Sequence, residues 1–221
     1  MTLWLAINGV LLLLAYLLGS LPTGYLAGRW LQGIDLREHG SGSTGATNVL
    51  RTLGKIPAIV VLLVDVLKGV LAIALVDLVY AFDPLQAIAS WQPWMVTLAG
   101  LGAILGHSKS IWLNFKGGKS VATSLGILLA MSWQVGLLTM VVFGVGMAIS
   151  RIVSLSSIAG AIALSGIMFL LGQPLAYELF AIAASLYVIW LHRTNIQRLL
   201  AGTEPKVGQK LSQPSEPSLE S

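Results

Sequence analysis

The sequence has no cysteine and very few charged side chains. Asp, Glu, Lys and Arg make up only 10% of its 221 residues, whereas soluble domains carry about 25%. The absence of cysteine excludes disulfide bonds, a thiolate nucleophile and metal sites with thiolate ligands. The three histidines, His39, His107 and His192, are too widely spaced to predict a metal site. We therefore expect neither a metal ion nor a cofactor.

Most side chains of the sequence are apolar. Hydrophobic residues make up 56% of the chain, and the mean hydropathy is +0.83, which is typical of an integral membrane protein. No alternating β-barrel pattern is visible, so helices are the only spanning elements to consider. The first apolar stretch, residues 3–28, is as long as a bilayer requires. The first positive charge, Arg29, follows it, which predicts an uncleaved first span with its N-terminus outside.

The fold class that we predict is an all-α integral membrane protein with about seven transmembrane helices. The third, fourth and fifth apolar stretches are short, so tilted, broken and re-entrant helices are all compatible with them. We assign residues 1–205 to the membrane domain and the polar, Pro- and Ser-rich residues 206–221 to a disordered tail. The seven apolar stretches are residues 3–28, 56–80, 94–105, 121–131, 135–149, 153–171 and 175–191.

The distribution of positive charge predicts the orientation. With the N-terminus outside and seven crossings, twelve of the 13 Lys and Arg residues fall on one side. This side is then cytoplasmic, as is the C-terminus, because Lys and Arg concentrate in cytoplasmic loops. The exception is Lys68, inside the second apolar stretch. Membrane orientation also accounts for the pI of about 9.5, and no RNA- or DNA-binding motif is visible, so we expect no nucleic-acid partner.

The first inner segment, residues 40–51, reads GSGSTGATNVLR. Its glycines allow backbone N–H groups to converge on an anion. A helix that begins near Thr47 would add its N-terminal N–H groups, and Arg51 can bind a phosphate with two hydrogen bonds. The competing interpretation is a flexible connector with a helix cap at Thr47. The side-chain donors of the segment are Ser41, Ser43, Thr47 and Asn48.

The second inner segment contains GGKS, which is similar to the end of a nucleotide-binding P-loop. The full motif needs a glycine at position 113, where this chain has Leu113, so the motif is incomplete. Gly117, Gly118 and Lys119 still form a local anion site. Lys116 fits better as a membrane anchor.

Two further inner segments carry hydroxyl, amide and imidazole groups. Ser150 could donate to a ligand or cap a helix, and the sequence favours neither. His192 and Asn195 lie three residues apart and share a helix face where the last apolar stretch ends. They could hold a hydroxyl or phosphate oxygen, or simply form an interfacial helix end.

Two charged residues, Asp65 and Lys68, lie inside the second apolar stretch. Charges inside a membrane are costly and are usually paired or functional. Their three-residue spacing predicts a mutual salt bridge. A role for Lys68 in binding an anionic substrate is compatible with that pairing.

The polar segments together resemble one family. They are similar to the bacterial membrane glycerol-3-phosphate acyltransferases that use acyl-phosphate, the PlsY family. The resemblance covers nearly the whole chain except the tail. It is carried by GSLPTGYLAGR at 19–29, GSGSTGATNVLRTLGK at 40–55, DVLKG at 65–69, GHSKSIWLNFKGGKSVAT at 106–123, SRIVSLSSI at 150–158 and HRTNIQRLLAGTE at 192–204.

The resemblance implies that a fatty acyl group moves from acyl-phosphate to the 1-hydroxyl of sn-glycerol 3-phosphate. The products are lysophosphatidic acid and phosphate, and the reaction is the first step of phospholipid biosynthesis. The resemblance also implies site residues. Those for acyl-phosphate are Ser41, Ser43, Gly45, Thr47, Asn48 and, less directly, Ser150; those for glycerol 3-phosphate are Arg51, Lys68, Lys119, His192 and Asn195; those that act in catalysis are Ser41, Arg51, Lys119, His192 and Asn195.

The mechanism implied by the family is direct transfer without an acyl-enzyme. The absence of cysteine and of a recognisable Ser-His-Asp set agrees with it, because phosphate is already a good leaving group. The proton acceptor stays open between a substrate phosphate and His192. The resemblance also implies a multi-pass protein of the bacterial inner membrane with a cytoplasmic site, functional coupling to the enzyme that makes acyl-phosphate, and a monomer as the simplest state.

Two alternative functions are an acyltransferase of a different class and an organophosphate transporter. One acyltransferase class carries a His-x4-Asp pair, but the residues five positions after the histidines are Thr44, Trp112 and Gln197. An organophosphate transporter would also place cations near a membrane cavity. It needs access from both sides, whereas the predicted phosphate-binding residues all lie on one side.

Overall fold

The computed structural model describes residues 2–82 and 89–209, and each predicted apolar stretch forms a helix there. The observed bounds lie within a few residues of the predicted ones, except at the end of the first stretch. The predicted all-α architecture is therefore confirmed. The seven apolar helices of these two described ranges are α1 (Thr2–Ser20), α4 (Lys55–Tyr80), α6 (Gln92–Ser108), α7 (Val121–Met131), α8 (Trp133–Ser150), α9 (Val153–Leu170) and α10 (Leu175–Leu191).

Several of these helices are long and apolar enough to cross a membrane. Four spans qualify in the described part of the chain, the first being Leu3–Gln32, which joins α1 to α2. A fifth qualifies if α10 and α11 (Arg193–Leu200) count as one span despite the 60° bend between them. Helix α7 has 11 residues and is about 16 Å long, against about 30 Å for a bilayer core. The chain is thus a multi-pass membrane protein, and the count of seven spans stays a prediction.

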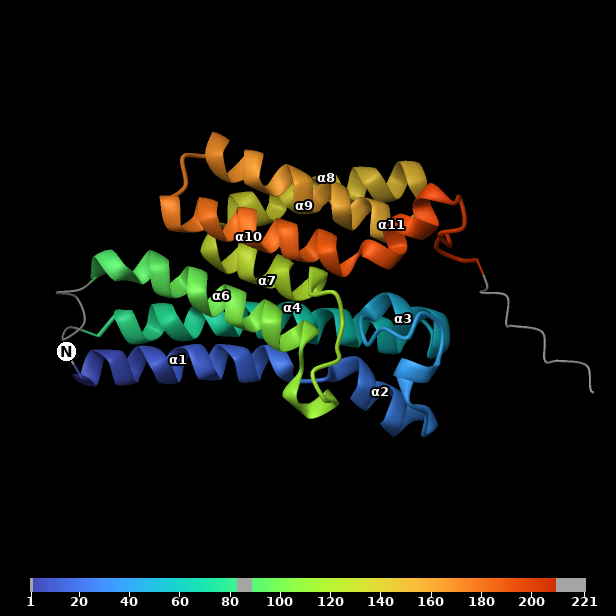
Figure 1. Ribbon diagram of the computed structural model, residues 1–221, viewed down its shortest axis with the longest axis horizontal. Helices are drawn as coiled ribbons and strands as arrows, with labels where there is room; N and C mark the ends of the chain where they lie inside the picture. Colours follow the sequence, from blue (N-terminus) through green and yellow to red (C-terminus); the bar gives the residue numbers. More distant parts are fainter. Residues whose placement is uncertain (1, 83–88, 210–221) are drawn as a thin grey trace, which may run out of the picture.

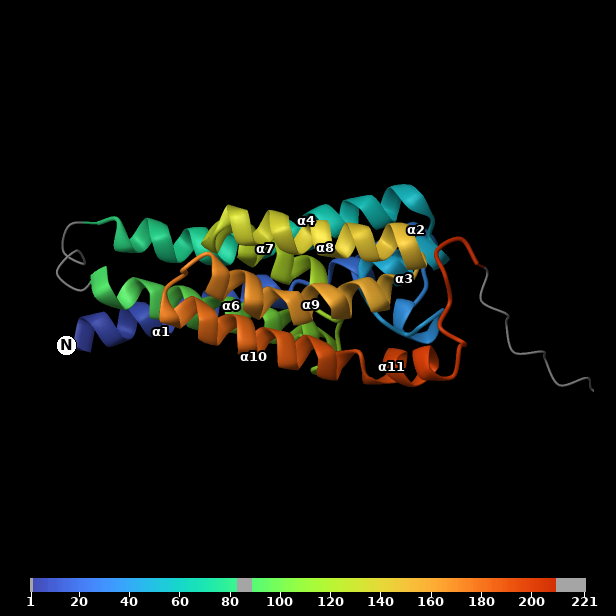
Figure 2. The ribbon, with the colours of Figure 1, turned by 90° about the horizontal axis from the view of Figure 1, so that it is seen from above.

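The helices run alternately in opposite directions along one long axis. Helices α1, α4 and α6 form one layer, α8, α9 and α10 form another, and α7 lies between them (Figure 1). Helix α7 contacts helices of both layers. The short helices α2 (Thr23–Gln32), α3 (Ala46–Thr52) and α11 gather at one end, far from the N-terminus (Figure 2). The four predicted inner segments therefore meet at this end.

Glycines bring the helices of the first layer into close contact. A methyl group on Gly19 of α1 would lie 2.2 Å from the carbonyl oxygen of Ala103 in α6. One on Gly69 of α4 would lie 2.2 Å from the carbonyl oxygen of Thr123 in α7. Only glycine permits such backbone approach, as small residues do at many membrane helix contacts. The core between the layers includes the fully buried Phe180.

The first apolar stretch does not form one straight helix. Helix α1 ends at Ser20, and α2 begins at Thr23 after a break at Leu21 and Pro22. Proline lacks the N–H group that would continue the helical ladder, and it restricts the residue before it. The stretch predicted to run through residue 28 is therefore divided at this break.

The predicted tail is ordered where it begins. The backbone N–H of Val207 donates to the carbonyl oxygen of Arg151, 2.8 Å away, between α8 and α9. Val207 is half-buried, whereas Lys206, Gly208 and Gln209 are exposed, and the domain boundary at residue 205 stays a prediction. Residues 210–221, the rest of the predicted disordered tail, lie outside the described residues.

Candidate active site

The glycine-rich loop between α2 and α3 is folded around one buried amide. Asn48 accepts a hydrogen bond from the backbone N–H of Ser41 at 2.9 Å. Its Nδ2 donates to the carbonyl oxygens of Leu36, His39 and Ser43, at 3.2, 2.9 and 2.8 Å. We expected this amide to donate to a phosphate, but its hydrogens are already engaged. Asn48 therefore stabilises the conformation of the loop.

The hydroxyl groups of this loop remain available. Helix α3 begins at Ala46 with Gly45 as its N-terminal flanking residue, one position before the predicted start. The Ser43 hydroxyl only accepts a long hydrogen bond of 3.4 Å from the Gly45 N–H. The hydroxyls of Ser41 and Thr47 make no hydrogen bond with any residue that the structure describes. The loop therefore presents three hydroxyl donors beside Arg51.

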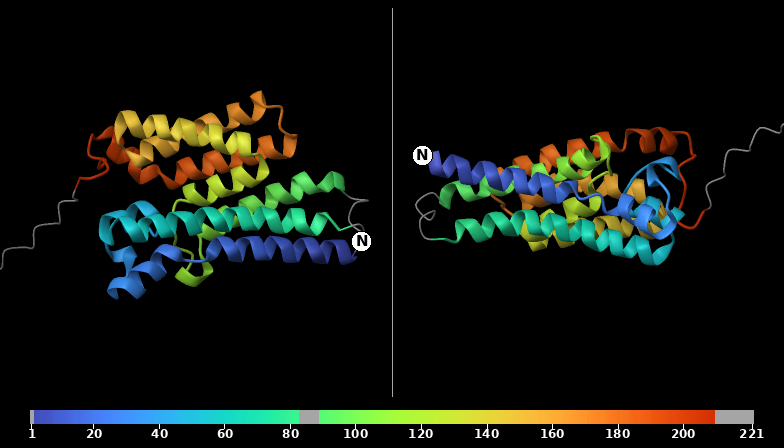
Figure 3. Two further views of the ribbon diagram at one scale, coloured as in Figure 1. Left: turned by 180° about the vertical axis from the view of Figure 1, so that it is seen from behind. Right: turned by 90° about the horizontal axis from the view of Figure 1, so that it is seen from below.

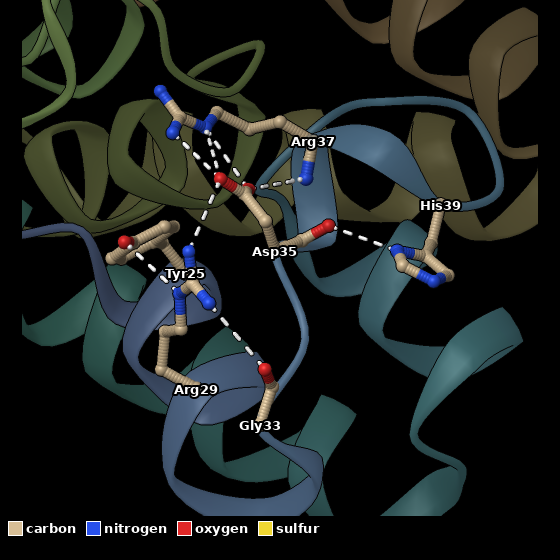
Figure 4. Close-up of polar contacts among 6 residues, drawn as sticks. All are labelled: Tyr25, Arg29, Gly33, Asp35, Arg37 and His39. Atoms are coloured by element: carbon tan, nitrogen blue, oxygen red, sulfur yellow. Dashed lines mark hydrogen bonds and ion pairs between the residues drawn. The ribbon is translucent and has the colours of Figure 1, made fainter.

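A clasp around Asp35 ties the base of this loop to α2 (Figure 4). The Asp35 carboxylate accepts from Arg37 at 2.7 Å and lies 3.8 Å from Arg29. Both guanidinium groups lie over the ring of Tyr25, at 5.2 and 5.4 Å from its centroid. The hydrogen bonds from Arg37 lower the pKa of Asp35 to about 2. The nearby imidazole of His39 lies 2.9 Å from the Asp35 carbonyl oxygen, which extends the clasp along the chain.

A second cluster joins α9, α11 and the loop before α7. The Glu204 carboxylate accepts hydrogen bonds from Ser154 at 2.7 Å, Asn195 at 2.6 Å and Arg198 at 2.6 Å. The Lys119 ammonium donates to the side-chain oxygen of Asn195. Because the amide nitrogen of Asn195 is engaged by Glu204, its oxygen must face Lys119. The carboxylate thus sets the direction of the lysine.

Positive charge exceeds negative charge in this cluster. Burial lowers the pKa of Arg51, while Glu204 opposes the shift. Burial, with repulsion from Arg198 and Arg51, lowers the pKa of Lys119 to about 8, again against Glu204. Burial would raise the pKa of Glu204, but the hydrogen bonds that it accepts outweigh this and lower it. Three cations around one carboxylate form a site that favours an anion.

His192 lies where α10 meets α11, and it is almost completely buried. Its Nδ1 lies 2.8 Å from the carbonyl oxygen of Val188. A carbonyl can only accept, so Nδ1 carries the hydrogen and Nε2 is the acceptor of the neutral ring. Lys119 and Glu204 are close enough to act electrostatically on the ring. His192 and Asn195 therefore lie in the same region of the structure as Lys119, and their contact with substrate stays a prediction.

Lys68 lies in a different, buried cluster. Its ammonium is 2.9 Å from the Asp65 carboxylate and donates to the Leu21 carbonyl oxygen at 3.1 Å. Asp65 also accepts from Thr23 at 2.6 Å, and the ring of His107 lies 3.8 Å away. The predicted Asp65–Lys68 salt bridge is confirmed. The described contacts of Lys68 are structural, and a contact with substrate stays a prediction.

Ser150 has local partners at the end of α8. Its hydroxyl donates to the Gly146 carbonyl oxygen at 2.7 Å and accepts from the Ile152 N–H at 3.0 Å. These bonds favour the helix-capping interpretation of Ser150 over the expected contact with acyl-phosphate.

Sequence reasoning missed three members of the Glu204 cluster. The sequence alone predicts no role for Ser154, Arg198 or Glu204. Arg198 follows Asn195 by three residues on α11, so helix spacing alone could have placed it on the same face. No comparable signal was available for Ser154, which lies 50 residues from Glu204 in the chain.

The comparison with known proteins decides the family. A family model described as glycerol-3-phosphate acyltransferase matches residues 9–202. The chain belongs to this family. The glycerol-3-phosphate acyltransferase of Trichormus variabilis is 66% identical over 225 residues, which covers 99% of this chain and all of the relative. The one from Trichodesmium erythraeum is 61% identical over 218 residues, 95% of this chain and 96% of the relative.

Solved structures place the chain within the PlsY branch of the family. Crystal structures of PlsY, an integral membrane glycerol 3-phosphate acyltransferase, match in a glycerol 3-phosphate form and a lysophosphatidic acid form. The first has a TM-score of 0.81 and 38% identity and covers 91% of this chain and 96% of its own. The second has a TM-score of 0.79 and 37% identity, with 91% and 95% covered. The predicted resemblance is confirmed, and the chain is a membrane acyltransferase of phospholipid biosynthesis.

Proposed function

We propose that the enzyme transfers a fatty acyl group from acyl-phosphate to the 1-hydroxyl of sn-glycerol 3-phosphate. The products are 1-acyl-glycerol 3-phosphate, which is lysophosphatidic acid, and inorganic phosphate. The observation that carries the proposal is the surplus of partly buried positive charge around Glu204, together with a loop whose hydroxyls have few partners among the described residues. The glycerol 3-phosphate and lysophosphatidic acid forms of the PlsY relatives support the acceptor and the product.

Both substrates carry phosphate, and the site offers two groups of anion-binding residues. The hydroxyls of Ser41, Ser43 and Thr47, with the Gly45 backbone, hold the phosphate of the acyl donor. Arg51, together with Lys119 beside Asn195, holds the phosphate of the acceptor. A phosphate monoester carries about −1.5 to −2 charge at neutral pH, which matches three cations balanced by one carboxylate. The acyl chain extends between helices toward the bilayer.

The reaction needs no enzyme nucleophile. The hydroxyl oxygen of glycerol 3-phosphate attacks the carbonyl carbon of the donor, and the bond from that carbon to the phosphate oxygen breaks. Phosphate leaves with the electron pair. Arg51 and Lys119 align the two reactants and neutralise charge, which are the largest contributions available to such a site.

The hydroxyl proton has two candidate acceptors. One is a phosphate oxygen of a substrate, which the reaction itself brings to the site. The other is Nε2 of His192, which the bond from Nδ1 to Val188 leaves unprotonated. A His192→Asn variant that keeps more than about a tenth of wild-type kcat favours the phosphate, since loss of a general base costs about 100-fold or more.

We further propose a topology and a cellular setting. Seven spans place the N-terminus outside and the site on the cytoplasmic side of the bacterial inner membrane. The single chain acts as a monomer, and an enzyme that makes acyl-phosphate supplies its donor. The described part of the chain contains both anion-binding groups, which is compatible with a complete site in one subunit.

The test is phosphate release by purified, detergent-solubilised protein given palmitoyl-phosphate and glycerol 3-phosphate. Acyl-CoA and an acyl carrier protein thioester serve as parallel donors. We expect phosphate and lysophosphatidic acid in equal amounts, only when both substrates are present. Turnover with only a thioester donor would refute acyl-phosphate as the donor. No phosphate or product with any donor would favour the transporter interpretation.

Single substitutions test the residues. Ser41→Ala and Arg51→Ala should each lower turnover by about 100-fold or more, because each removes a group that contacts a reacting phosphate. Lys55→Gln serves as the matched control, since Lys55 is exposed at the start of α4 and belongs to neither cluster. Melting temperatures establish that the variants fold. Full activity in a folded variant removes its residue from the site.

A further inference from the structure

The loop between α6 and α7 projects from the side of the bundle as a finger, residues 109–116. Its sequence is KSIWLNFK. It extends past the end of α1, away from the long axis (Figure 3). The finger exposes Trp112 to 62% and Phe115 to 58%, although large aromatic side chains are normally well covered.

The finger is held rigidly at its base. The Tyr16 hydroxyl donates to the Lys109 carbonyl oxygen at 2.8 Å, and Ser110 donates to the Ser20 carbonyl oxygen at 2.6 Å. Leu113, only 3% exposed, anchors the finger from below. The aromatic side chains are thus held outward by a structure that resists collapse onto the bundle.

The backbone of the finger adopts an unfavourable conformation to expose these side chains. Asn114 and Phe115 follow each other with φ of +52° and +58°. The left-handed region costs an ordinary residue about 1–2 kcal/mol. Phe115 is therefore held in the exposed position at a cost in backbone free energy.

Positive charges flank the exposed aromatic side chains. Lys109 and Lys116 are both exposed, and neither ammonium pairs with a group in the described ranges of the chain. Negative charge is absent nearby in sequence, since no Asp or Glu occurs from residue 84 to residue 177. Aromatic residues flanked by lysines, beside the ends of two apolar helices, match the border between acyl chains and lipid headgroups.

We propose that the finger binds anionic phospholipid of the surrounding bilayer. Trp112 and Phe115 enter the boundary between headgroups and acyl chains, and Lys109 and Lys116 pair with lipid phosphates. A lipid is the favoured occupant because the finger is tied to the end of α1 through Ser20. The finger leads directly into Gly117, so lipid contact also holds the segment that carries the catalytic loop.

The experiment measures the fluorescence of Trp112 in vesicles that contain brominated lipid. Bromine quenches indole emission at short range, and subtracting the emission of a Trp112→Phe variant isolates this residue among the seven tryptophans. Two vesicle compositions carry the same fraction of bromine, either on phosphatidylglycerol or on phosphatidylcholine. We expect brominated phosphatidylglycerol to quench about two-fold more strongly, since each lysine near the surface favours anionic lipid.

The lysine variants decide whether charge is responsible. Lys109→Gln combined with Lys116→Gln should equalise quenching by the two lipids, while Lys55→Gln combined with Lys206→Gln should leave the difference intact. Equal quenching in the wild-type protein, or no quenching by either lipid, overturns the proposal. The second of these outcomes would assign the finger to water or to a protein partner. The readout does not depend on acyl transfer, so it stands apart from the proposed reaction.

Discussion

At the scale of single residues, hydrogen bonds fix the orientation of the Asn195 amide and, through it, that of the Lys119 ammonium. Glu204 engages the amide nitrogen of Asn195, so the amide oxygen turns toward the lysine. The lysine is then buried among Arg198 and Arg51, which makes its charge costly until an anion arrives. A phosphate that enters this cluster relieves the repulsion between the cations, so binding and charge neutralisation are coupled.

The pH dependence of the enzyme follows from the pKa of Lys119, which is about 8 in the free protein. In the proposed reaction the ammonium form of Lys119 binds phosphate, and this form is lost as the pH rises through 8. Phosphate monoesters are already dianionic above pH 7. A loss of activity above pH 8 therefore reports a titrating group of the enzyme and not of the acceptor. We expect kcat/KM for glycerol 3-phosphate to fall by up to about ten-fold per pH unit above pH 8. Initial rates at low acceptor concentration measure it.

A Lys119→Arg variant provides the matched control. Arginine stays protonated throughout this range, so any activity that the variant keeps should not fall between pH 8 and pH 10. An alkaline limb with the same midpoint in both proteins would show that another group titrates.

Some candidate site residues can be predicted from the sequence, because their side chains and local motifs indicate the chemistry. Others cannot, because their role depends on contacts with residues that are distant in the chain. Arg51 and Lys119 are predicted anion-binding residues because they follow glycine-rich segments, whereas the sequence leaves His192 and Asn195 open between a ligand site and a helix end. The role of Asn48 does not follow from the sequence, since its amide is consumed by three carbonyl groups that only the folded loop brings together. The same holds for the Glu204 cluster, whose members come from separate helices.

At the scale of structural elements, the loop before α7 packs against His107. The N–H of Gly118 donates to the His107 carbonyl oxygen at 3.1 Å. A methyl group on Gly118 would lie 2.2 Å from Nε2 of the same residue. The ring cannot swing away, because Thr123 contacts its Nδ1 at 3.2 Å and Asp65 lies behind it. The buried Asp65 cluster thus supports, through His107, the glycines that precede Lys119.

Gly118→Ala should therefore displace Lys119 and lower kcat/KM by about 100-fold, the usual effect of a misplacement near 1 Å. The melting temperature should fall as well, because a buried backbone contact is forced apart. Steady-state kinetics and thermal unfolding measure the two effects. Gly166→Ala is the control, since Gly166 in α9 has no atom within 4 Å of the added methyl. Equal activity in both variants would contradict the seating of the loop on His107.

Elements follow from the sequence when local signals suffice to define them. Long apolar runs gave the helices, and the bounds of α7 and α10 agree with those predicted. The break before α2 was missed, although Pro22 is a known helix breaker, because apolar residues continue on both sides.

At the scale of the whole molecule, function depends on asymmetry between the two ends of the bundle. The loops around α2, α3 and α11 lie at one end of the bundle, and the loop between α6 and α7 lies at the side of the bundle beside the end of α1 (Figure 1). The opposite end has short connections without Lys or Arg. Such a molecule can gather anionic substrates on one side while an acyl chain stays among the apolar helices. Helix α7 has 11 residues, fewer than any of the other six apolar helices in the described residues, so its path decides how many times the chain crosses the membrane.

Cysteine labelling tests this topology directly, because the natural chain contains no cysteine. Seven spans place Ser90 and Gln134 outside and Glu38 and Gln209 inside. A membrane-impermeant maleimide should label Ser90→Cys and Gln134→Cys in spheroplasts, and should label the other two cysteine variants only after permeabilisation. All four positions are exposed, so accessibility reports the side of the membrane rather than burial. Labelling of Gln134→Cys from the same side as Glu38→Cys would mean that α7 turns back within the membrane, and the count of seven spans would be wrong.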